Sequence, residues 1–231
     1  MWNELVATPL FGIMVTLGFY AIAQWLYRRS GYLLLNPVLV SILAIILFLK
    51  GAGVSYEAYA EGGRIILFFL GPAVVALAIP LYARRAEILE KKGPILAGVF
   101  AGALASAVSA SGIAWLLGGS REVVLSLAPK SVTTPIAIGI VEKIGGIAPL
   151  TAALVVMTGC LGAVFGPEFC RLIGIRDEAA IGLAVGTAAH GIGTSRMLEI
   201  GQLGGAMAGL AIGLNGLVSA FLIPLLFVLF G

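Results

Sequence analysis

Residues 129–135 read PKSVTTP and residues 186–196 read GTAAHGIGTSR, two polar stretches set in an otherwise strongly apolar chain. Proline interrupts the first stretch and glycine the second. The hydrocarbon core of a membrane cannot solvate a lysine, an arginine or an opened backbone, so such groups must face protein or a water-filled cavity. Polar breaks in short hydrophobic segments also indicate the binding site of a transporter. We therefore expect these two stretches to carry the function.

The composition around the two stretches is that of an integral membrane protein. Of the 231 residues, 60% are apolar and only 11% are charged, and the mean hydropathy is +1.10. A soluble domain carries roughly 25% charged residues. Because a membrane-spanning helix needs about 20 apolar residues, we expect an all-α protein with roughly seven or eight crossings. These crossings form a single transmembrane domain over residues 1–231 and leave no room for a soluble one.

The apolar runs differ in length between the two halves of the chain. The expected spans cover residues 5–27, 33–49, 64–83, 93–117, 147–165 and 203–230. Between them we expect a surface connector over 50–63 and a polar connector from Gly166-Pro167 onward. Two further apolar segments, 131–144 and 179–190, are too short to cross as straight helices, since about 14 residues give about 21 Å against about 30 Å of hydrocarbon. We expect both to be broken or re-entrant.

Basic residues at the ends of the predicted spans indicate the orientation. Arg28 and Arg29 follow the first span, and the most charged loop covers residues 84–92. Two crossings separate these sites, so the positive-inside rule places both in the cytoplasm. The second half leaves two topologies open. Arg171 and Arg176 also lie inside if 131–144 turns back without crossing, and outside if it crosses.

The segment around Lys130 combines groups that bind a carboxylate. Ser131 is a candidate N-cap for a helix that begins near residue 132, where free N–H groups and the positive end of the helix dipole are exposed. Lys130, Thr133 and Thr134 surround the same end, and Pro135 breaks the hydrogen-bond ladder beyond it. N–H donors, hydroxyls and an ammonium together suit a carboxylate. The alternative is that the lysine snorkels to the interface and the hydroxyls only cap the helix.

The second stretch contains the only histidine of the chain, His190. It is followed by two helix-loosening glycines, two hydroxyls and a cation: Gly191, Gly193, Thr194, Ser195 and Arg196. Arg196 can bind a carboxylate through its planar fork, or pair with Glu199 one turn on. His190 is either a buried, hydrogen-bonded imidazole or a substrate donor and proton relay.

Other residues suggest proton coupling and hinges. The candidates for a coupling proton are Glu142, Glu168 and Glu199, for which structural ion pairing is the alternative. Four residues are expected to keep the backbone open at the breaks: Pro72, Pro135, Gly191 and Gly193.

Glycine recurs at every fourth position from Gly201 through Gly205 and Gly209 to Gly213. Shorter repeats of this spacing occur at 98 and 102, 162 and 166, and 182 and 186. Such a face lets another backbone approach closely, either within the chain or in the homodimer that we expect. The two polar tips also share a hydroxyl pair ahead of a short helix. That likeness fits inverted repeats, although chance produces it too.

No motif of an enzyme, metal site or cofactor site stands out in the sequence. The chain has no GxSxG, HExxH or P-loop pattern. Cys160 and Cys170 lack the spacing of metal ligands and indicate buried free thiols. The net charge of +3 comes from basic residues at span ends and does not indicate nucleic acid as a partner. We therefore expect a non-enzymatic protein without metal or cofactor.

Three long stretches resemble the LrgB/CidB family. They are LGPAVVALAIPLY at 70–82, LAPKSVTTPIAIGI at 127–140 and GAVFGPEFCRLIGIRDEAAIGLAVGTAAHGIGTSR at 162–196. The resemblance implies a multi-pass protein of the cytoplasmic (inner) membrane, holin-like or antiholin-like and linked to murein hydrolase control and lysis. Members of the family are often encoded beside a smaller LrgA/CidA membrane partner. It also implies transport, since a plastid branch translocates glycolate and glycerate and bacterial members have been tied to pyruvate uptake.

Two functions follow as hypotheses. In the first, the protein transports small monocarboxylates of the glycolate, glycerate or pyruvate type. Lys130 and the first amides of the helix after Ser131 hold the carboxylate, while Arg196 binds or gates the anion. The hydroxyls of Thr133, Thr134, Thr194 and Ser195 bind the substrate's hydroxyl or keto oxygen, and His190 or Glu199 carries a proton. In the alternative, the protein is a holin-like or antiholin-like component that acts by oligomerising and modulates murein hydrolases.

Overall fold

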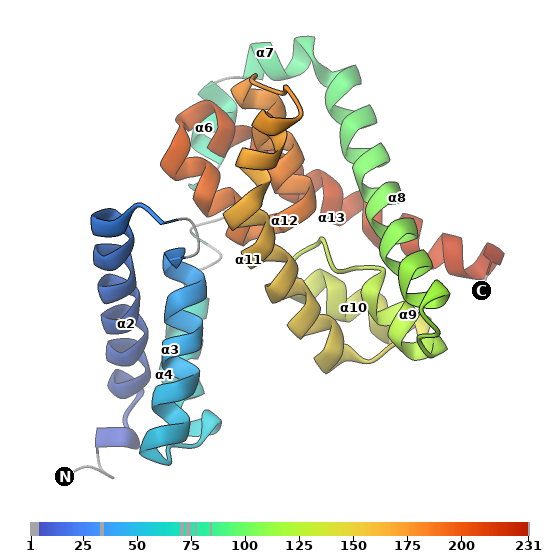
Figure 1. Cartoon of the computed structure of the whole chain (residues 1–231). Coiled ribbons are helices and arrows are strands. Elements are labelled where there is room, and N and C mark those ends of the chain that lie inside the picture. Colours follow the sequence, from blue (N-terminus) through green and yellow to red (C-terminus); the bar gives the residue numbers. More distant parts are fainter. Residues whose placement is uncertain are drawn as a thin grey trace. The chain divides into compact units, whose positions relative to one another are not determined.

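The computed structural model describes residues 5–32, 35–69, 72, 75–76, 78–83 and 85–230. Every regular element within these ranges is a helix, which confirms the predicted all-α class. Residue contacts divide the chain into two compact units, 1–76 and 77–231. Figure 1 shows the helices of both units in chain order. The single transmembrane domain over 1–231 stays a prediction.

The first unit consists of α2 (Pro9–Ser30), α3 (Pro37–Ala52) and α4 (Tyr56–Phe68). The start of α3 is as the sequence predicts, because Pro37 takes the first turn and the Asn36 side chain accepts hydrogen bonds from the amides of Val38 and Leu39. Most of the surface connector predicted over 50–63 is helical, and its location at the membrane surface stays a prediction. Helix α4 fills much of it, since the Ser55 side chain caps the helix by accepting from the amide of Ala58.

Close backbone packing joins α2 to α4. A Cβ at Gly12 would overlap the Tyr59 carbonyl, and one at Gly62 would overlap Pro9 and Gly12. Two facing glycines therefore let the helices touch, as small residues do in membrane proteins. The hydroxyls of Thr16 and Tyr59 are also 2.8 Å apart across this contact. The core of the unit is built on Phe11, Ile45 and Leu49.

The span predicted over 64–83 is not one continuous helix. Its first residues belong to α4, which ends at Phe68 with Phe69 as its C-cap. Gly71 of this span lies outside the described residues. Pro72 is described, although residues 70–71 and 73–74 around it are not, and its role as a hinge stays a prediction.

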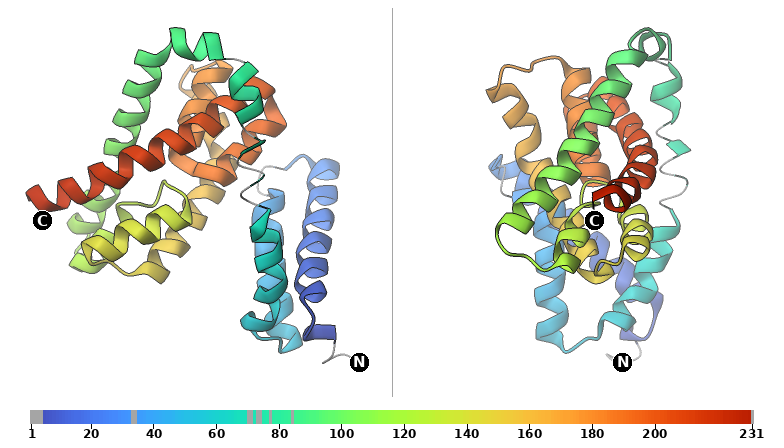
Figure 2. Two further views of the ribbon diagram at one scale, coloured as in Figure 1. Left: turned by 180° about the vertical axis from the view of Figure 1, so that it is seen from behind. Right: turned by 90° about the vertical axis from the view of Figure 1, so that its right-hand side faces the viewer.

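The second unit contains eight helices within the described residues. They are α6 (Ala78–Ala83), α7 (Arg85–Glu90), α8 (Lys92–Leu116), α9 (Arg121–Leu127), α10 (Thr134–Ile144), α11 (Ala148–Leu172), α12 (Glu178–Ile200) and α13 (Gln202–Phe230). Helix α12 packs against α11, α13 and α8, and α10 packs against α11 and α13 (Figures 1 and 2). The short α9–α10 pair thereby lies against the long helices of this unit.

The closest contact in the second unit is between α12 and α13. A Cβ at Gly182 would overlap the backbone of Gly204, and one at Gly186 would overlap the backbone of Ala208. The glycine spacing predicted from the sequence therefore serves helix packing within the chain at these positions. A Cβ at Gly213, by contrast, would meet no atom within 4 Å in the described part of the chain. The homodimer stays a prediction.

Helix α11 runs further than the sequence suggested. It continues through Gly166-Pro167 to Leu172, with the buried Pro167 inside it. The connector predicted from Gly166-Pro167 onward therefore begins too early. Helices in membranes tolerate an internal proline because neighbouring groups satisfy the carbonyl that it frees.

Helix α12 contains the break predicted for the second polar stretch. The element runs from Glu178 to Ile200, and His190 inside it has non-helical dihedral angles, φ 41° and ψ −135°. No other residue in the described ranges, apart from glycine, has a positive φ. Gly191 and Gly193 follow the kink and lie within the helix beyond it.

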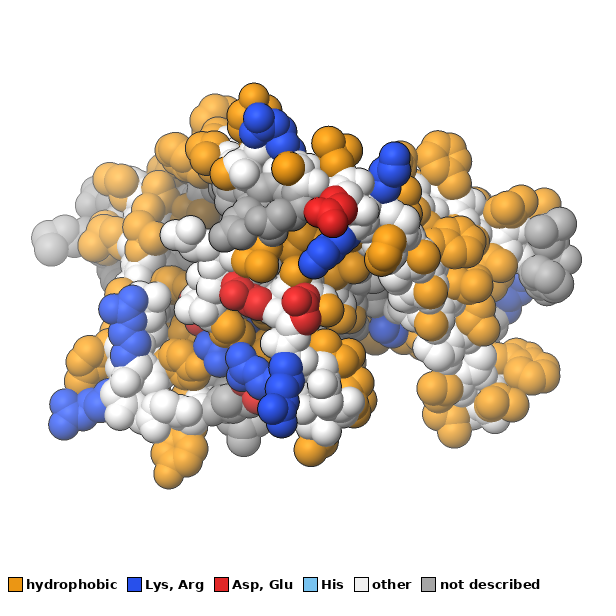
Figure 3. Space-filling model, turned by 90° about the horizontal axis from the view of Figure 1, so that it is seen from above, with side chains coloured by type: hydrophobic (Ala, Val, Ile, Leu, Met, Phe, Trp, Pro, Cys, Tyr) orange, Lys and Arg blue, Asp and Glu red, His pale blue; other side chains and the backbone are white. Residues whose placement is uncertain are grey.

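The outer surface supports a membrane location. Four helices of the described residues are long and apolar enough to cross a membrane: Pro9–Ser30, Lys92–Leu116, Ala148–Leu172 and Gln202–Val228. Large apolar side chains such as Trp115, Leu172 and Phe221 are exposed, and hydrophobic side chains cover much of the face in Figure 3. Lipid would cover such a surface. The remaining crossings of the predicted seven or eight, and the re-entrant path, stay predictions.

Candidate functional site

The first polar stretch forms the link between α9 and α10. Helix α10 begins at Thr134, with Thr133 as an N-cap that makes no side-chain capping bond. The prediction that Ser131 caps this helix is therefore wrong, because its buried hydroxyl lies 2.7 Å from the hydroxyl of Ser106 on α8. Pro135 lies in the first turn, where its missing N–H costs least, and starts the helix instead of breaking it.

The Lys130 ammonium lies at this hydroxyl pair. It donates to the Ser106 hydroxyl at 3.1 Å and to the Ser131 hydroxyl at 3.2 Å. The residue is half-buried, and within the described part of the chain no acidic side chain forms an ion pair with it. Two neutral hydroxyls solvate the charge without balancing it. Such an arrangement can accept an anion, because charge-assisted hydrogen bonds are the strong ones.

A pocket of about 350 Å³ lies beside this cluster, between α8 and α12. Glycine, alanine and leucine make up most of its lining, and Ser106 and Thr187 are the residues with hydroxyls. Small-molecule sites typically hold about 300–1,000 Å³ and combine apolar walls with a few polar groups. Ser106 both lines the pocket and accepts a hydrogen bond from Lys130. The Ser106 hydroxyl therefore links the ammonium to the pocket.

Asn215 of α13 joins the two polar stretches. Its side-chain nitrogen donates to the Ser131 carbonyl at 3.1 Å and to the Thr187 carbonyl at 2.9 Å, and its side-chain oxygen accepts from the Ser219 hydroxyl at 3.2 Å. Asn215 is 1% exposed. Breaks in helices leave backbone carbonyls without their usual partners. A single buried amide here binds one carbonyl beside each break.

The ring of His190 is held between α12 and α11. Its Nε2 lies 2.9 Å from the Val155 carbonyl, so the ring donates there, and Gly159 provides the space beneath it. The Thr194 hydroxyl donates to the His190 carbonyl at 2.9 Å, and the Ser195 hydroxyl donates to the Ile192 carbonyl at 2.8 Å. The two hydroxyls predicted to bind substrate are thus bonded to their own helix in this structure.

Arg196 lies with two acids beyond the kink. Its guanidinium is 3.2 Å from a Glu199 oxygen on the same helix and 3.7 Å from a Glu168 oxygen on α11. The other carboxylate oxygen of Glu168 is buried and has no hydrogen-bond partner within the described residues. Glu168 and Glu199 therefore form ion pairs with Arg196, which is the alternative to a role in proton coupling. The third candidate, Glu142, is exposed on α10.

The structure brings together only part of the predicted site. Lys130 and Ser131 meet, and their contacts add Ser106 and Asn215, which the sequence interpretation did not include. A signal for both existed, since each is a polar residue inside a predicted apolar span, where such side chains hydrogen-bond to other helices. Their partners across the fold could not be read from the sequence.

Fold and site together define an all-helical membrane protein with a half-buried lysine that has no acid partner among the described residues and lies beside a pocket lined mostly by small residues. The chain belongs to the LrgB-like family, whose sequence model matches residues 16–229. The resemblance inferred from the three sequence stretches is thereby confirmed.

Full-length relatives agree with this assignment. The chain is 38% identical to the uncharacterized protein YxaC of Bacillus subtilis, over 94% of this chain and 95% of the relative. It is 36% identical to the antiholin-like protein LrgB of Bacillus mycoides, with the same coverage, and 34% identical to the antiholin-like protein LrgB of Bacillus subtilis, over 99% of both chains. No solved structure matches the chain.

Proposed function

We propose that the protein is an antiholin-like component of the cytoplasmic membrane that modulates murein hydrolase activity and cell lysis. The observation that carries this proposal is the near-complete overlap with relatives named antiholin-like, 94% and 99% of this chain. Because the overlap includes both units, the whole membrane protein is shared and not a single module. This favours the alternative hypothesis of the sequence over transport. A smaller membrane protein of the LrgA/CidA type is the proposed partner.

Lysis of a bacterial host tests this function. The chain would be expressed, alone and with a partner of the LrgA/CidA type, in a strain that lacks its own proteins of both families. We expect slower autolysis and weaker murein hydrolase bands in zymograms of the culture medium than with an empty vector. Unchanged lysis in both strains, with the protein present in the membrane, would contradict the proposal. An effect only in the paired strain would support it and identify the partner as obligatory.

A second candidate, the transport of small monocarboxylates, is favoured by the Lys130 cluster. Its ammonium has hydroxyl partners and no acid partner within the described residues, and it lies one hydroxyl from a pocket of about 350 Å³. A small carboxylate entering that pocket would take the place of the missing counter-ion. Ser106 and Ser131 would then orient the carboxylate through their hydroxyls. In this scheme Arg196 does not bind substrate, since two carboxylates already surround its guanidinium.

Uptake by liposomes that contain only this protein tests the second candidate. We expect saturable uptake of radiolabelled glycolate that pyruvate inhibits. Lys130→Met should abolish it, whereas Lys143→Met, which removes an exposed lysine at the end of α10, should leave it unchanged. Equal uptake by both variants would exclude Lys130 as the anion site. An absence of uptake by correctly inserted wild-type protein would exclude self-sufficient transport and leave the antiholin-like proposal unaffected.

A further inference from the structure

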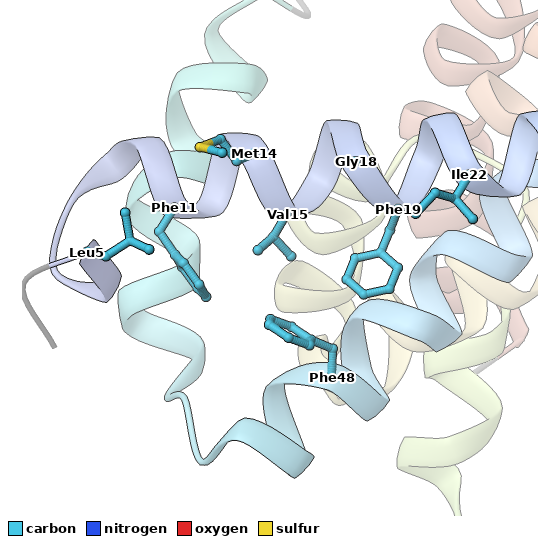
Figure 4. A pocket seen from close by; sticks show the side chains of 8 residues that line it. All are labelled: Leu5, Phe11, Met14, Val15, Gly18, Phe19, Ile22 and Phe48. Carbon is cyan, nitrogen blue, oxygen red and sulfur yellow. The ribbon is translucent and has the colours of Figure 1, made fainter. Parts of the chain in front are cut away.

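A second pocket lies in the first unit and shares no lining residue with the candidate site of the second unit. It has a volume of about 280 Å³ and lies along α2, where Phe48 of α3 closes one side (Figure 4). All of its lining residues are apolar or glycine. Gly18 lies in the middle of this α2 groove, and a Cβ there would meet no atom of the described residues within 4 Å. The groove is thus open at Gly18, because glycine has no side chain to fill it.

A cation lies on the same face of α2, beyond the end of the groove. In a helix, residues spaced by three and four positions share one face, so Gly18, Ile22, Trp25 and Arg29 form one line. The Arg29 guanidinium lies over the Trp25 ring, 5.7 Å from its centroid. Arg29 is roughly 10 Å from Ile22 along the axis at 1.5 Å per residue. The described residues include no acid paired with Arg29 or its neighbour Arg28.

We propose that the α2 groove binds an anionic phospholipid, with an acyl chain along Gly18 and the phosphate at Arg29. The groove offers the acyl chain an apolar surface that no described side chain of the unit fills. Trp25, which is 60% exposed, lies between groove and cation, as tryptophan does at the level where acyl chains end and headgroups begin. A guanidinium matches a phosphate through paired N–H donors.

Charge selects the anionic lipid over a zwitterionic one. Arg29 places a positive charge at the end of the groove, and no acid within the described residues compensates it. The positive-inside rule places this end in the cytoplasm, where the leaflet is rich in anionic lipids. A zwitterionic headgroup carries its own cation, which Arg29 repels. The acyl chain alone would give no preference between headgroups.

The adjacent arginine provides a matched control. Arg28 and Arg29 are both exposed and carry the same charge at the same depth. One residue turns an α-helix by about 100°, so Arg28 points away from the line of Gly18 and Ile22 while Arg29 continues it. A general attraction between basic residues and the membrane would use both arginines equally. A site built on the α2 groove requires Arg29 alone.

Native mass spectrometry of the delipidated full chain in detergent tests the proposal. Phosphatidylglycerol and phosphatidylcholine with identical acyl chains are the probes. We expect the wild type to bind phosphatidylglycerol more tightly. Arg29→Gln should weaken that binding roughly fivefold, which corresponds to about 1 kcal/mol for one basic residue, and remove the preference. Arg28→Gln should change it less than twofold, and Gly18→Leu, which fills the groove, should weaken binding of both lipids.

Three results would overturn the proposal. They are equal binding of the two lipids by the wild type, equal losses in Arg28→Gln and Arg29→Gln, and undiminished binding by Gly18→Leu. Circular dichroism and melting confirm that each variant is folded. Because both arginines are exposed, their comparison decides the headgroup site even if Gly18→Leu fails to fold.

Discussion

The side-chain nitrogen of Asn215 lies 2.9 Å from the carbonyl oxygen of Thr187, one turn before the kink at His190. The same nitrogen also binds the Ser131 carbonyl in the link between α9 and α10. One amide of α13 thereby ties together the two polar stretches on which the function was expected to depend. A protein that uses these breaks must keep that amide in place.

Replacing Asn215 should destabilise the fold strongly. Asn215→Leu keeps a similar shape and removes both donors, which leaves two buried carbonyls unsatisfied at about 1–3 kcal/mol each. Ser219→Ala removes only the donor to the Asn215 oxygen and should cost about 0.5–1.5 kcal/mol. Thermal unfolding in detergent measures both effects. Equal melting temperatures for the two variants would show that the two carbonyls find other partners.

Replacing Lys130 should not destabilise the protein. Its ammonium is half-buried without an acid partner in the described residues, so its desolvation is poorly compensated. Lys130→Met keeps the length of the side chain and removes the charge. We expect a stability equal to the wild type or higher by about 1 kcal/mol, measured as the melting temperature. A large loss would instead mean that the lysine holds α8 to the α9–α10 link.

The contact between α12 and α13 should tolerate no side chain. At Gly182 a Cβ would overlap the backbone of Gly204, which cannot move aside without separating the helices. Gly182→Leu should therefore prevent folding and yield aggregated protein on size-exclusion chromatography. Gly213→Ala on the same α13 should be neutral or stabilising by about 0.5–1 kcal/mol, because the added methyl meets no atom of the described residues within 4 Å. If Gly213→Ala changes an oligomeric state instead, this position faces a second copy.

The packing of the His190 ring can be tested by a substitution at Gly159, which lies against the ring. A Cβ at Gly159 would lie 2.8 Å from the ring, so Gly159→Ala should displace the imidazole and weaken its bond to Val155. We expect a loss of about 1–3 kcal/mol, typical of overpacking. Gly191→Ala, beside the same kink in open space, is the control. A stable Gly159→Ala protein with altered lysis or uptake would show that the ring acts in function and not only in packing.

Local patterns in the sequence predicted much of what the structure shows. Asn36-Pro37 marked the start of α3, and the charge-poor runs marked the long helices α8 and α13, because capping and hydrophobicity act over a few residues. The prediction failed where a distant partner changes the outcome. Ser131 had the sequence of an N-cap, although its hydroxyl bonds to Ser106 on another helix. Pro167 had the sequence of a helix end, although the packed helix continues through it.

By itself, the sequence determined that this is an all-helical membrane protein of the LrgB-like family with a lysine and a histidine at two breaks. Composition and short motifs depend only on the residues themselves and their neighbours in the chain, so the sequence is enough to establish them. The tertiary structure alone decided the partners of those residues. Lys130 lies with Ser106, His190 with Val155, and Arg196 with Glu168. A hydrogen bond or ion pair depends on a few ångströms between residues far apart in the chain, and only the packing of the helices sets that distance.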